Sequence, residues 1–135
     1  MTAATCEVAA ASKKRLPKLL LIDDNPIQLR IRETVLRDAG FDVSVATTAA
    51  SALALLRSET DAGTVEAIIT DHVMPGASGA DFVRELRKVN QDVPVIVVSG
   101  MVEAEDEYEG LNATFRQKPC PPPELIALAR DVMKQ

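Results

Sequence analysis

The sequence predicts a three-layer α/β protein in which a doubly wound sheet of five parallel strands lies between helices. Three observations predict this fold class. Short apolar or alternating runs bounded by turn residues recur along the 135 residues, as expected for strands. Amphipathic helical patterns separate these runs, which is the alternation of a parallel sheet. Because crossovers between parallel strands are right-handed, the helices must divide between the two faces of the sheet.

We expect residues 1–16 to be a flexible N-terminal extension and residues 17–135 to form one domain. A chain of this length can bury one core of ordinary size but not two. The extension is rich in Ala, Thr and Ser. Its basic residues follow its apolar ones, which is the reverse of the order in a signal peptide.

The first predicted strand, residues 18–22, runs directly into Asp23 and Asp24. A helix is predicted to begin at Pro26, which suits a first helical turn, and to end at Gly40. Its apolar residues at helical spacing are Ile27, Ile31 and Val35. This spacing is typical of the apolar face of an amphipathic helix.

Residues 41–46 alternate between apolar and polar side chains and predict the second strand. The next helix has Thr47 or Thr48 available as its N-cap. Its amphipathic pattern rests on Ala49, Ala52, Leu53 and Leu56. A polar loop over residues 58–64 then leads to the third strand.

The third strand carries the residue around which we expect the functional site to form. Residues 67–70 are a buried apolar run that delivers Asp71 to a loop containing Pro75 and Gly76. Open α/β sheets bind ligands just beyond the carboxyl ends of their strands, which is the expected position of Asp71. The pattern of the following helix rests on Phe82, Leu86 and Val89.

The fourth strand, residues 93–98, is the most apolar and ends at Ser99, so Pro94 must lie near its start. The acidic segment 101–110 predicts a short or irregular helix. Residues 114–118 are polar and predict an edge strand. The apolar stripe of a closing helix consists of Leu125, Leu128, Ala129 and Val132.

Composition argues against several classes of protein. The net charge of −5 disfavours direct nucleic-acid binding, which needs a basic surface to neutralise phosphates. No apolar run approaches the length that crosses a bilayer. Cys6 and Cys120 have no metal-ligand spacing, so we expect reduced thiols in a cytoplasmic protein.

Residues that carry chemistry follow four of the predicted strands. They are Asp23, Asp24, Asp71, Ser99 and Lys118. Parallel strands end on the same side of a sheet, so these side chains are expected to meet at one rim. Neighbouring carboxylates there would repel by roughly 3 to 4 kcal/mol per close pair at an effective dielectric near 20. A cation must compensate, and an all-oxygen site with few ligands favours Mg²⁺, or Mn²⁺.

A carboxylate beside a divalent cation, a lysine and a hydroxyl group can accept a phosphoryl group. Taken singly, each residue also has a simple structural explanation. Ser99 could cap a helix, Lys118 could be a solvated edge charge, and Asp23 could be the N-cap of the first helix. The only histidine, His72, points to the opposite face of its strand from Asp71 and is expected to be a packed or surface residue.

Four segments together make the chain similar to the bacterial response-regulator receiver domain of two-component phosphorelay systems. They are residues 20–25, 68–76, 95–100 and 115–119, and the resemblance extends from about residue 18 to the end. It implies the flavodoxin-like strand order 2-1-3-4-5. It also implies the roles of individual residues.

By this resemblance, Asp71 is the phosphoacceptor and Lys118 binds the phosphoryl group. Asp23, Asp24, Asp71 and the main-chain carbonyl of Val73 are implied to hold the metal. Ser99 and Phe115 are implied to form the conformational switch. The peptide bond between Lys118 and Pro119 is a candidate for the cis form.

The chain departs from the family pattern at two places. The segment from Ser99 to Phe115 is short, and Arg116 replaces a residue that is commonly aliphatic. The family positions that hold a hydrolytic water are Val73 and Met101 here, and neither side chain can orient a water. We therefore expect a long-lived phosphorylated form.

The resemblance implies a signalling module that a sensor histidine kinase or phosphotransfer protein phosphorylates in the presence of Mg²⁺. It would act on an unidentified protein partner, bind neither nucleic acid nor membrane, and not be a turnover enzyme. One alternative is a receiver-like interaction module that is never phosphorylated. Another is an aspartate-nucleophile phosphatase, whose Asp-x-Asp signature the residues Asp23, Asp24 and Asn25 do not supply. A receiver excised from a hybrid kinase would look the same.

Overall fold

Five parallel strands form one sheet in the order β2-β1-β3-β4-β5, as predicted. The structure is a computed structural model and describes residues 16–58, 65–74 and 76–134. The apolar sequences of β3 and β4 suit strands that are buried on both faces. The strands are β1 (Lys18–Ile22), β2 (Asp42–Ala46), β3 (Ala67–Asp71), β4 (Val95–Ser99) and β5 (Ala113–Gln117).

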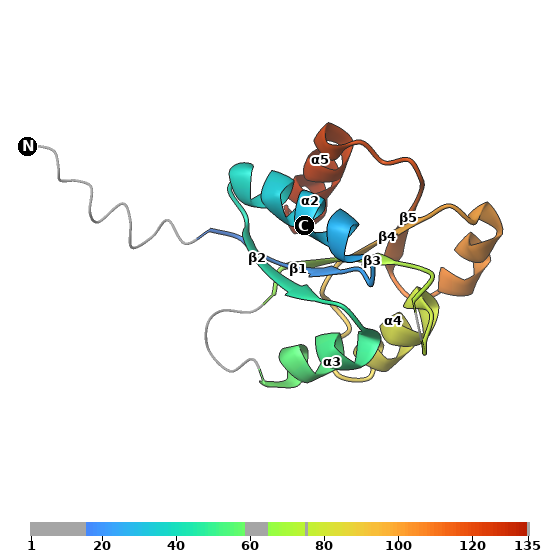
Figure 1. Ribbon diagram of the computed structural model, residues 1–135. Coiled ribbons are helices and arrows are strands. Elements are labelled where there is room, and N and C mark those ends of the chain that lie inside the picture. The colour runs from blue at the N-terminus through green and yellow to red at the C-terminus, as the bar shows by residue number, and fades with distance from the viewer. Residues whose placement is uncertain (1–15, 59–64, 75, 135) are drawn as a thin grey trace, which may run out of the picture.

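Helices cover both faces of the sheet, which confirms the doubly wound architecture. Helices α2 and α5 lie on one face, and α3 and α4 lie on the other (Figure 1). A 3-10 helix, η1, precedes the edge strand β5. Their bounds are α2 (Pro26–Asp38), α3 (Ala49–Ser58), α4 (Gly79–Arg87), η1 (Val102–Tyr108) and α5 (Pro122–Met133). None of the helices in the described ranges has the length and apolarity needed to cross a membrane.

Alternate side chains of the strands enter two separate cores. Leu20 and Ile22 of β1 join the core beneath α3 and α4, whereas Leu19 and Leu21 join the core beneath α2 and α5. Burying a Leu side chain of this kind stabilises the fold by roughly 1.5 to 3 kcal/mol relative to exposing it. The two cores hold the strand ends in a fixed register, and this register positions the site.

Most predicted strand boundaries agree with the structure to within two residues. Residues 18–22 form β1 as expected, and polar β5 is an edge strand. Pro94 directly precedes β4, so its missing N–H removes nothing from the ladder. Much of the expected extension over 1–16 and of the expected loop over 58–64 lies outside the described residues.

The predicted apolar face of α2 is wrong. Ile27 is 72% exposed and Ile31 is 56% exposed, whereas Leu29 and Leu36 are the residues that α2 buries. Both sets have helical spacing, and the way α2 packs on the sheet and on α5 decides which set is covered. Leu29 and Leu36 pack into the same core as Leu125 of α5.

Helix α4 is shorter than its predicted apolar stripe. Phe82 and Leu86 are fully buried as expected, but the helix ends at Arg87, and Val89 is 58% exposed. The acidic segment 101–110 forms the 3-10 helix η1, in agreement with the predicted short or irregular helix.

Candidate functional site

The parallel register brings the ends of four strands to one rim of the sheet. Asp23 directly follows β1, Asp71 ends β3 and Ser99 ends β4. Lys118 directly follows β5, and its backbone N–H donates to the carbonyl of Ser99 at 2.8 Å. The four strand ends therefore converge as predicted. The side chains of Asp23, Asp71 and Lys118 form one polar site, whereas the Ser99 hydroxyl bonds the backbone of Met101.

Asp23 is fully buried and is held by the turn that opens α2. Its Oδ1 accepts a hydrogen bond from the backbone N–H of Asn25 at 2.9 Å. Asn25 is the N-cap, since its own side chain accepts from the N–H groups of Ile27 and Gln28. The simple explanation of Asp23 as the N-cap is thus excluded, and Asp23 Oδ2 faces the site.

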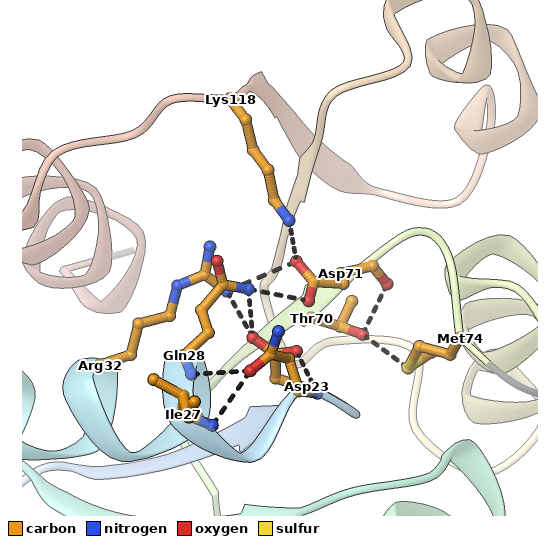
Figure 2. A network of polar contacts seen from close by, with 9 residues as sticks. Asp23, Ile27, Gln28, Arg32, Thr70, Asp71, Met74 and Lys118 are labelled. Atoms are coloured by element: carbon orange, nitrogen blue, oxygen red, sulfur yellow. Dashed lines mark hydrogen bonds and ion pairs between the residues drawn. The ribbon is translucent and has the colours of Figure 1, made fainter.

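Asp71 is 5% exposed and is surrounded by donors (Figure 2). Lys118 Nζ lies 3.2 Å from Asp71 Oδ1, so Lys118 is not a solvated edge charge. Arg32 Nη1 lies 3.4 Å from the same oxygen, and Gln28 Nε2 lies 3.4 Å from Oδ2. Two cations and an amide therefore compensate one nearly buried carboxylate.

The three acids form a cluster that suits a hard divalent cation. One carboxylate oxygen each from Asp23, Asp24 and Asp71 lies within 4.8 Å of the others. Asp24 is exposed and the other two are buried, so the cluster has both a solvent side and a protein side. All-oxygen ligands with room for water are what Mg²⁺ prefers. The residues present therefore fit the expected metal, with Val73 in the loop directly after β3.

Burial raises the pKa of Asp71 from its ordinary value of 3.8 to about 6, with the help of a hydrogen bond to Asp23 and the charge of Asp23. The positive charges of Arg32 and Lys118 act in the opposite direction. Because the charge of Asp23 disfavours ionisation of Asp71, an additional cation at this point would favour the ionised form of Asp71. This unfavourable interaction between neighbouring carboxylates again indicates a cation site.

Ser99 and Phe115 lie on the neighbouring strands β4 and β5. Ser99 is 3% exposed, and its Oγ accepts a hydrogen bond from the backbone N–H of Met101 at 2.9 Å. Phe115 is partly buried and pairs in register with Val97, two residues before Ser99. The hydroxyl therefore lies on the neighbouring strand, two residues along the sheet from the position opposite the ring.

His72 is packed as expected, and it links the site to η1. It is buried, and its Nδ1 shares a hydrogen bond of 2.7 Å with the hydroxyl of Tyr108. The ring of Tyr108 lies 5.9 Å, centroid to centroid, from that of Phe115. At Gly79, which opens α4, an added Cβ would lie 2.7 Å from the backbone oxygen of Asp71, so only glycine fits there.

The sequence patterns did not predict Gln28, Arg32 or Tyr108 as members of this network. Arg32 lies three residues after Leu29 and four before Leu36, which places it on the buried face of α2. That spacing was the signal that could have identified it. The peptide bond between Lys118 and Pro119 is cis, in agreement with the resemblance. Cys120 is a free thiol, and Cys6 lies outside the described residues.

The fold and the acidic rim together define a doubly wound α/β protein with a carboxylate site at its strand ends, and comparisons with known proteins assign the family. Residues 19–130 match the family model of the response regulator receiver domain. The chain is 31% identical to the transcriptional regulatory protein AruR of Pseudomonas aeruginosa, over 89% of this chain and 50% of that protein. It is 34% identical to the transcriptional regulatory protein PrrA of Mycobacterium tuberculosis, over 88% of this chain and 51% of that protein.

A solved structure has the same fold. It is a CheY-like response regulator receiver domain from Methanospirillum hungatei, with a TM-score of 0.81 and 22% identity over 89% of this chain and 95% of that one. The chain belongs to the response regulator receiver domain family. It spans about half the length of the curated relatives that it matches.

Proposed function

We propose that this chain is the phosphoacceptor module of a two-component phosphorelay. In this proposal Asp71 accepts a phosphoryl group, in a Mg²⁺-dependent reaction, from a sensor histidine kinase or a phosphotransfer protein. One observation carries the proposal. The nearly buried Asp71 carboxylate lies 3.2 Å from the Lys118 ammonium and within the acidic cluster that Asp23 and Asp24 complete.

The side chains at the rim have separate tasks in the transfer. An Asp71 oxygen attacks the phosphorus of a phosphohistidine, a P–O bond forms, and the P–N bond breaks with its electron pair remaining on the imidazole nitrogen. Lys118 stabilises the negative charge on the transferring oxygens. A Mg²⁺ ion held by Asp23, Asp24, Asp71 and the Val73 carbonyl would neutralise further charge on these oxygens.

The product of this reaction is a changed protein conformation, and the protein is not a turnover enzyme. We propose that the Ser99 hydroxyl moves toward the new phosphoryl oxygens and that the Phe115 ring repacks in response. The partly buried Phe115 ring, in contact with Tyr108 of η1, supports this role. Small shifts of this kind select between discrete packings in switch proteins.

An exposed apolar surface beside the rim supports docking of a protein donor. Ile27 and Ile31 are both largely exposed on α2, and they line a hollow together with Lys118 and Pro119. Large apolar side chains exposed beside a reactive site are typical of protein interaction surfaces. The net charge of −5 supports partners other than nucleic acid for this chain, although its curated relatives are transcriptional regulators.

A receiver-like module that is never phosphorylated is the second candidate, because one observation favours it. The guanidinium of Arg32 lies against Asp23 and Asp71, where a divalent cation would bind. If Arg32 held that position permanently, the site would act only as a structural ion-pair network. The two candidates differ in whether Asp71 can be phosphorylated.

Mass spectrometry tests the proposal directly. We expect incubation with Mg²⁺ and acetyl phosphate to add one phosphoryl group to the parent protein, because Asp71 supplies the nucleophile. The Asp71→Asn variant should gain none, because its amide oxygen is a poor nucleophile. Equal labelling of this variant, or equal labelling of the parent after chelation of the metal, would contradict the proposal. Absence of labelling under all conditions would favour the second candidate.

A further inference from the structure

Arg32 reaches Asp23 and Asp71 of the acidic cluster from the buried face of α2 (Figure 2). Its side chain is only 12% exposed. The Nη1 atom lies 3.3 Å from Asp23 Oδ2 and 3.4 Å from Asp71 Oδ1, so a single nitrogen bridges two of the three acids. An arginine buried to this extent, between two carboxylates, is a specific arrangement and not a surface ion pair.

Gln28, one helical turn before Arg32, donates to the same two acids. Its Nε2 lies 2.5 Å from Asp23 Oδ2 and 3.4 Å from Asp71 Oδ2. Together with Lys118, these α2 side chains supply donors to Asp23 Oδ2 and to both carboxylate oxygens of Asp71. The two buried acids of the cluster are therefore already engaged on the oxygens that face each other, whereas Asp24 is its exposed member.

A divalent cation and Arg32 therefore compete for the same oxygens. Mg²⁺ bonds to oxygen at about 2.0–2.1 Å and demands near-ideal octahedral geometry. A guanidinium that already donates to Asp23 Oδ2 and Asp71 Oδ1 would occupy coordination space and repel the ion.

The charge balance of the rim also favours exchange of one cation for the other. The three acids of the cluster face two positive charges, on Arg32 and Lys118. A divalent ion that replaced Arg32 would bring the local charge to zero when all three acids are ionised. Keeping both Arg32 and the ion would leave an excess positive charge in a partly buried site.

The surroundings of Arg32 allow it to leave without unfolding α2. Arg32 lines the hollow that Ile27, Ile31 and Pro119 also line. Because this hollow opens beside exposed residues of α2, the long and flexible side chain has space to turn out of the cluster.

We propose that Arg32 is a built-in cation that occupies the metal site of the metal-free protein and must withdraw from Asp23 and Asp71 when Mg²⁺ binds. Arg32 then sets the Mg²⁺ concentration that the protein requires. This inference rests on the metal site of the proposed function.

Calorimetric titration of metal-stripped protein with Mg²⁺ tests the proposal. Removing the competing guanidinium in Arg32→Met should tighten Mg²⁺ binding by about tenfold or more, since hydrogen bonds to charged groups are among the strong ones. Arg30→Met is the matched control. It removes the same charge from an exposed position two residues away, and it should change the dissociation constant by less than about twofold because solvent and salt screen that charge.

A second measurement uses the parent protein and does not depend on a variant that folds. In ¹⁵N-labelled protein, the Nη1–H groups of Arg32, which donate to Asp23 and Asp71, should exchange with solvent more slowly without metal than at saturating Mg²⁺. The proposal is overturned if Arg32→Met binds Mg²⁺ no more tightly than the parent, or if this exchange rate does not respond to the metal. In those cases only the proposed role of Arg32 fails, and the proposed metal site is retained. If neither protein binds Mg²⁺, the metal site and the role of Arg32 both fail.

Discussion

At the scale of single residues, the ionisation of Asp71 is coupled to folding of the metal-free protein. Burial and Asp23 raise its pKa to about 6, whereas an unfolded chain would hold it near its ordinary value of 3.8. Between these two values the folded protein keeps a proton that the unfolded chain has lost. The protonated Asp71 therefore contributes to the free energy of unfolding. This contribution is present in full below the pKa that Asp71 has in the unfolded chain, and it is lost as the pH rises through the pKa that Asp71 has in the folded protein.

Urea unfolding in the presence of a chelator checks this linkage. From about pH 4 to about pH 6, the free energy of unfolding of the parent should fall relative to that of Asp71→Asn, which has no group to titrate there. Saturating Mg²⁺ should remove most of this difference, because the metal binds the ionised form. Parallel pH profiles for parent and variant without metal would show that Asp71 is not perturbed.

Single residues also show where prediction from sequence succeeds. Asp23, Asp71 and Lys118 could be placed together because each follows a strand, and parallel strands end on one side of a sheet. Arg32 could not be placed in the same way. Its spacing from Leu29 indicates the buried face of α2, but the reach of its side chain to Asp23 depends on the tertiary position of the helix.

At the scale of elements, α2 illustrates the limit of periodicity. Ile27 and Ile31 on one side, and Leu29 and Leu36 on the other, are both compatible with an amphipathic helix. Only the tertiary packing of α2 against the sheet and α5 decides that the leucines are covered. The helix was therefore predictable, whereas the face that it exposes beside the site was not.

The short element η1 is attached to the core by two residues. Because acidic residues surround them, the sequence pattern does not predict that they are buried. Ala104 and Tyr108 are the buried residues of η1. The Tyr108 hydroxyl bonds His72, which directly follows Asp71, and its ring contacts Phe115 of β5. The elements β3, η1 and β5 are therefore linked through side chains that pass directly behind the site.

This linkage leads to a prediction for Ser99→Ala. The variant should accept a phosphoryl group, because Asp71 and Lys118 are unchanged. It should fail to transmit the change to β5 and η1, because the hydroxyl that follows the phosphoryl oxygens is missing. Hydrogen exchange of residues 102–117, with and without acetyl phosphate and Mg²⁺, measures this response. A phosphorylation-dependent change as large as in the parent would rule out the coupling.

At the scale of the whole molecule, the rim of the sheet brings together residues with separate proposed roles. In the proposed function Asp71 and Lys118 perform the chemistry and Ser99 begins the path to β5. Helix α2 contributes Arg32 inside the site and Ile27 and Ile31 outside it. A partner that covers the exposed side of α2 would therefore contact the helix that carries Arg32. The proposed docking surface and the proposed metal requirement are in this way connected through a single element, α2.

The lifetime of the phosphorylated protein is a further property of this rim. Hydrolysis of an aspartyl phosphate needs a water in line with the phosphorus, and positioning is most of what a protein contributes to that step. By resemblance to the family, the positions that hold this water are Val73, two residues after Asp71, and Met101, two after Ser99. Both residues line one hollow beside the end of β3, and both are partly exposed. Neither side chain can accept a proton or orient a water.

We therefore predict a long-lived phosphoprotein whose reset depends on a phosphatase or on back-transfer to a kinase. A double variant, Val73→Asn with Met101→Glu, introduces an amide and a carboxylate at these positions and should lose its phosphoryl group at least about tenfold faster, a modest gain for positioned polar groups. The measurement is the decay of phosphorylated protein by mass spectrometry after the donor is removed. Val73→Leu with Met101→Leu is the matched control, since it keeps both side chains apolar and should decay as slowly as the parent. Because water positioning is the only cause invoked, decay of the parent as fast as that of the polar double variant would refute the argument.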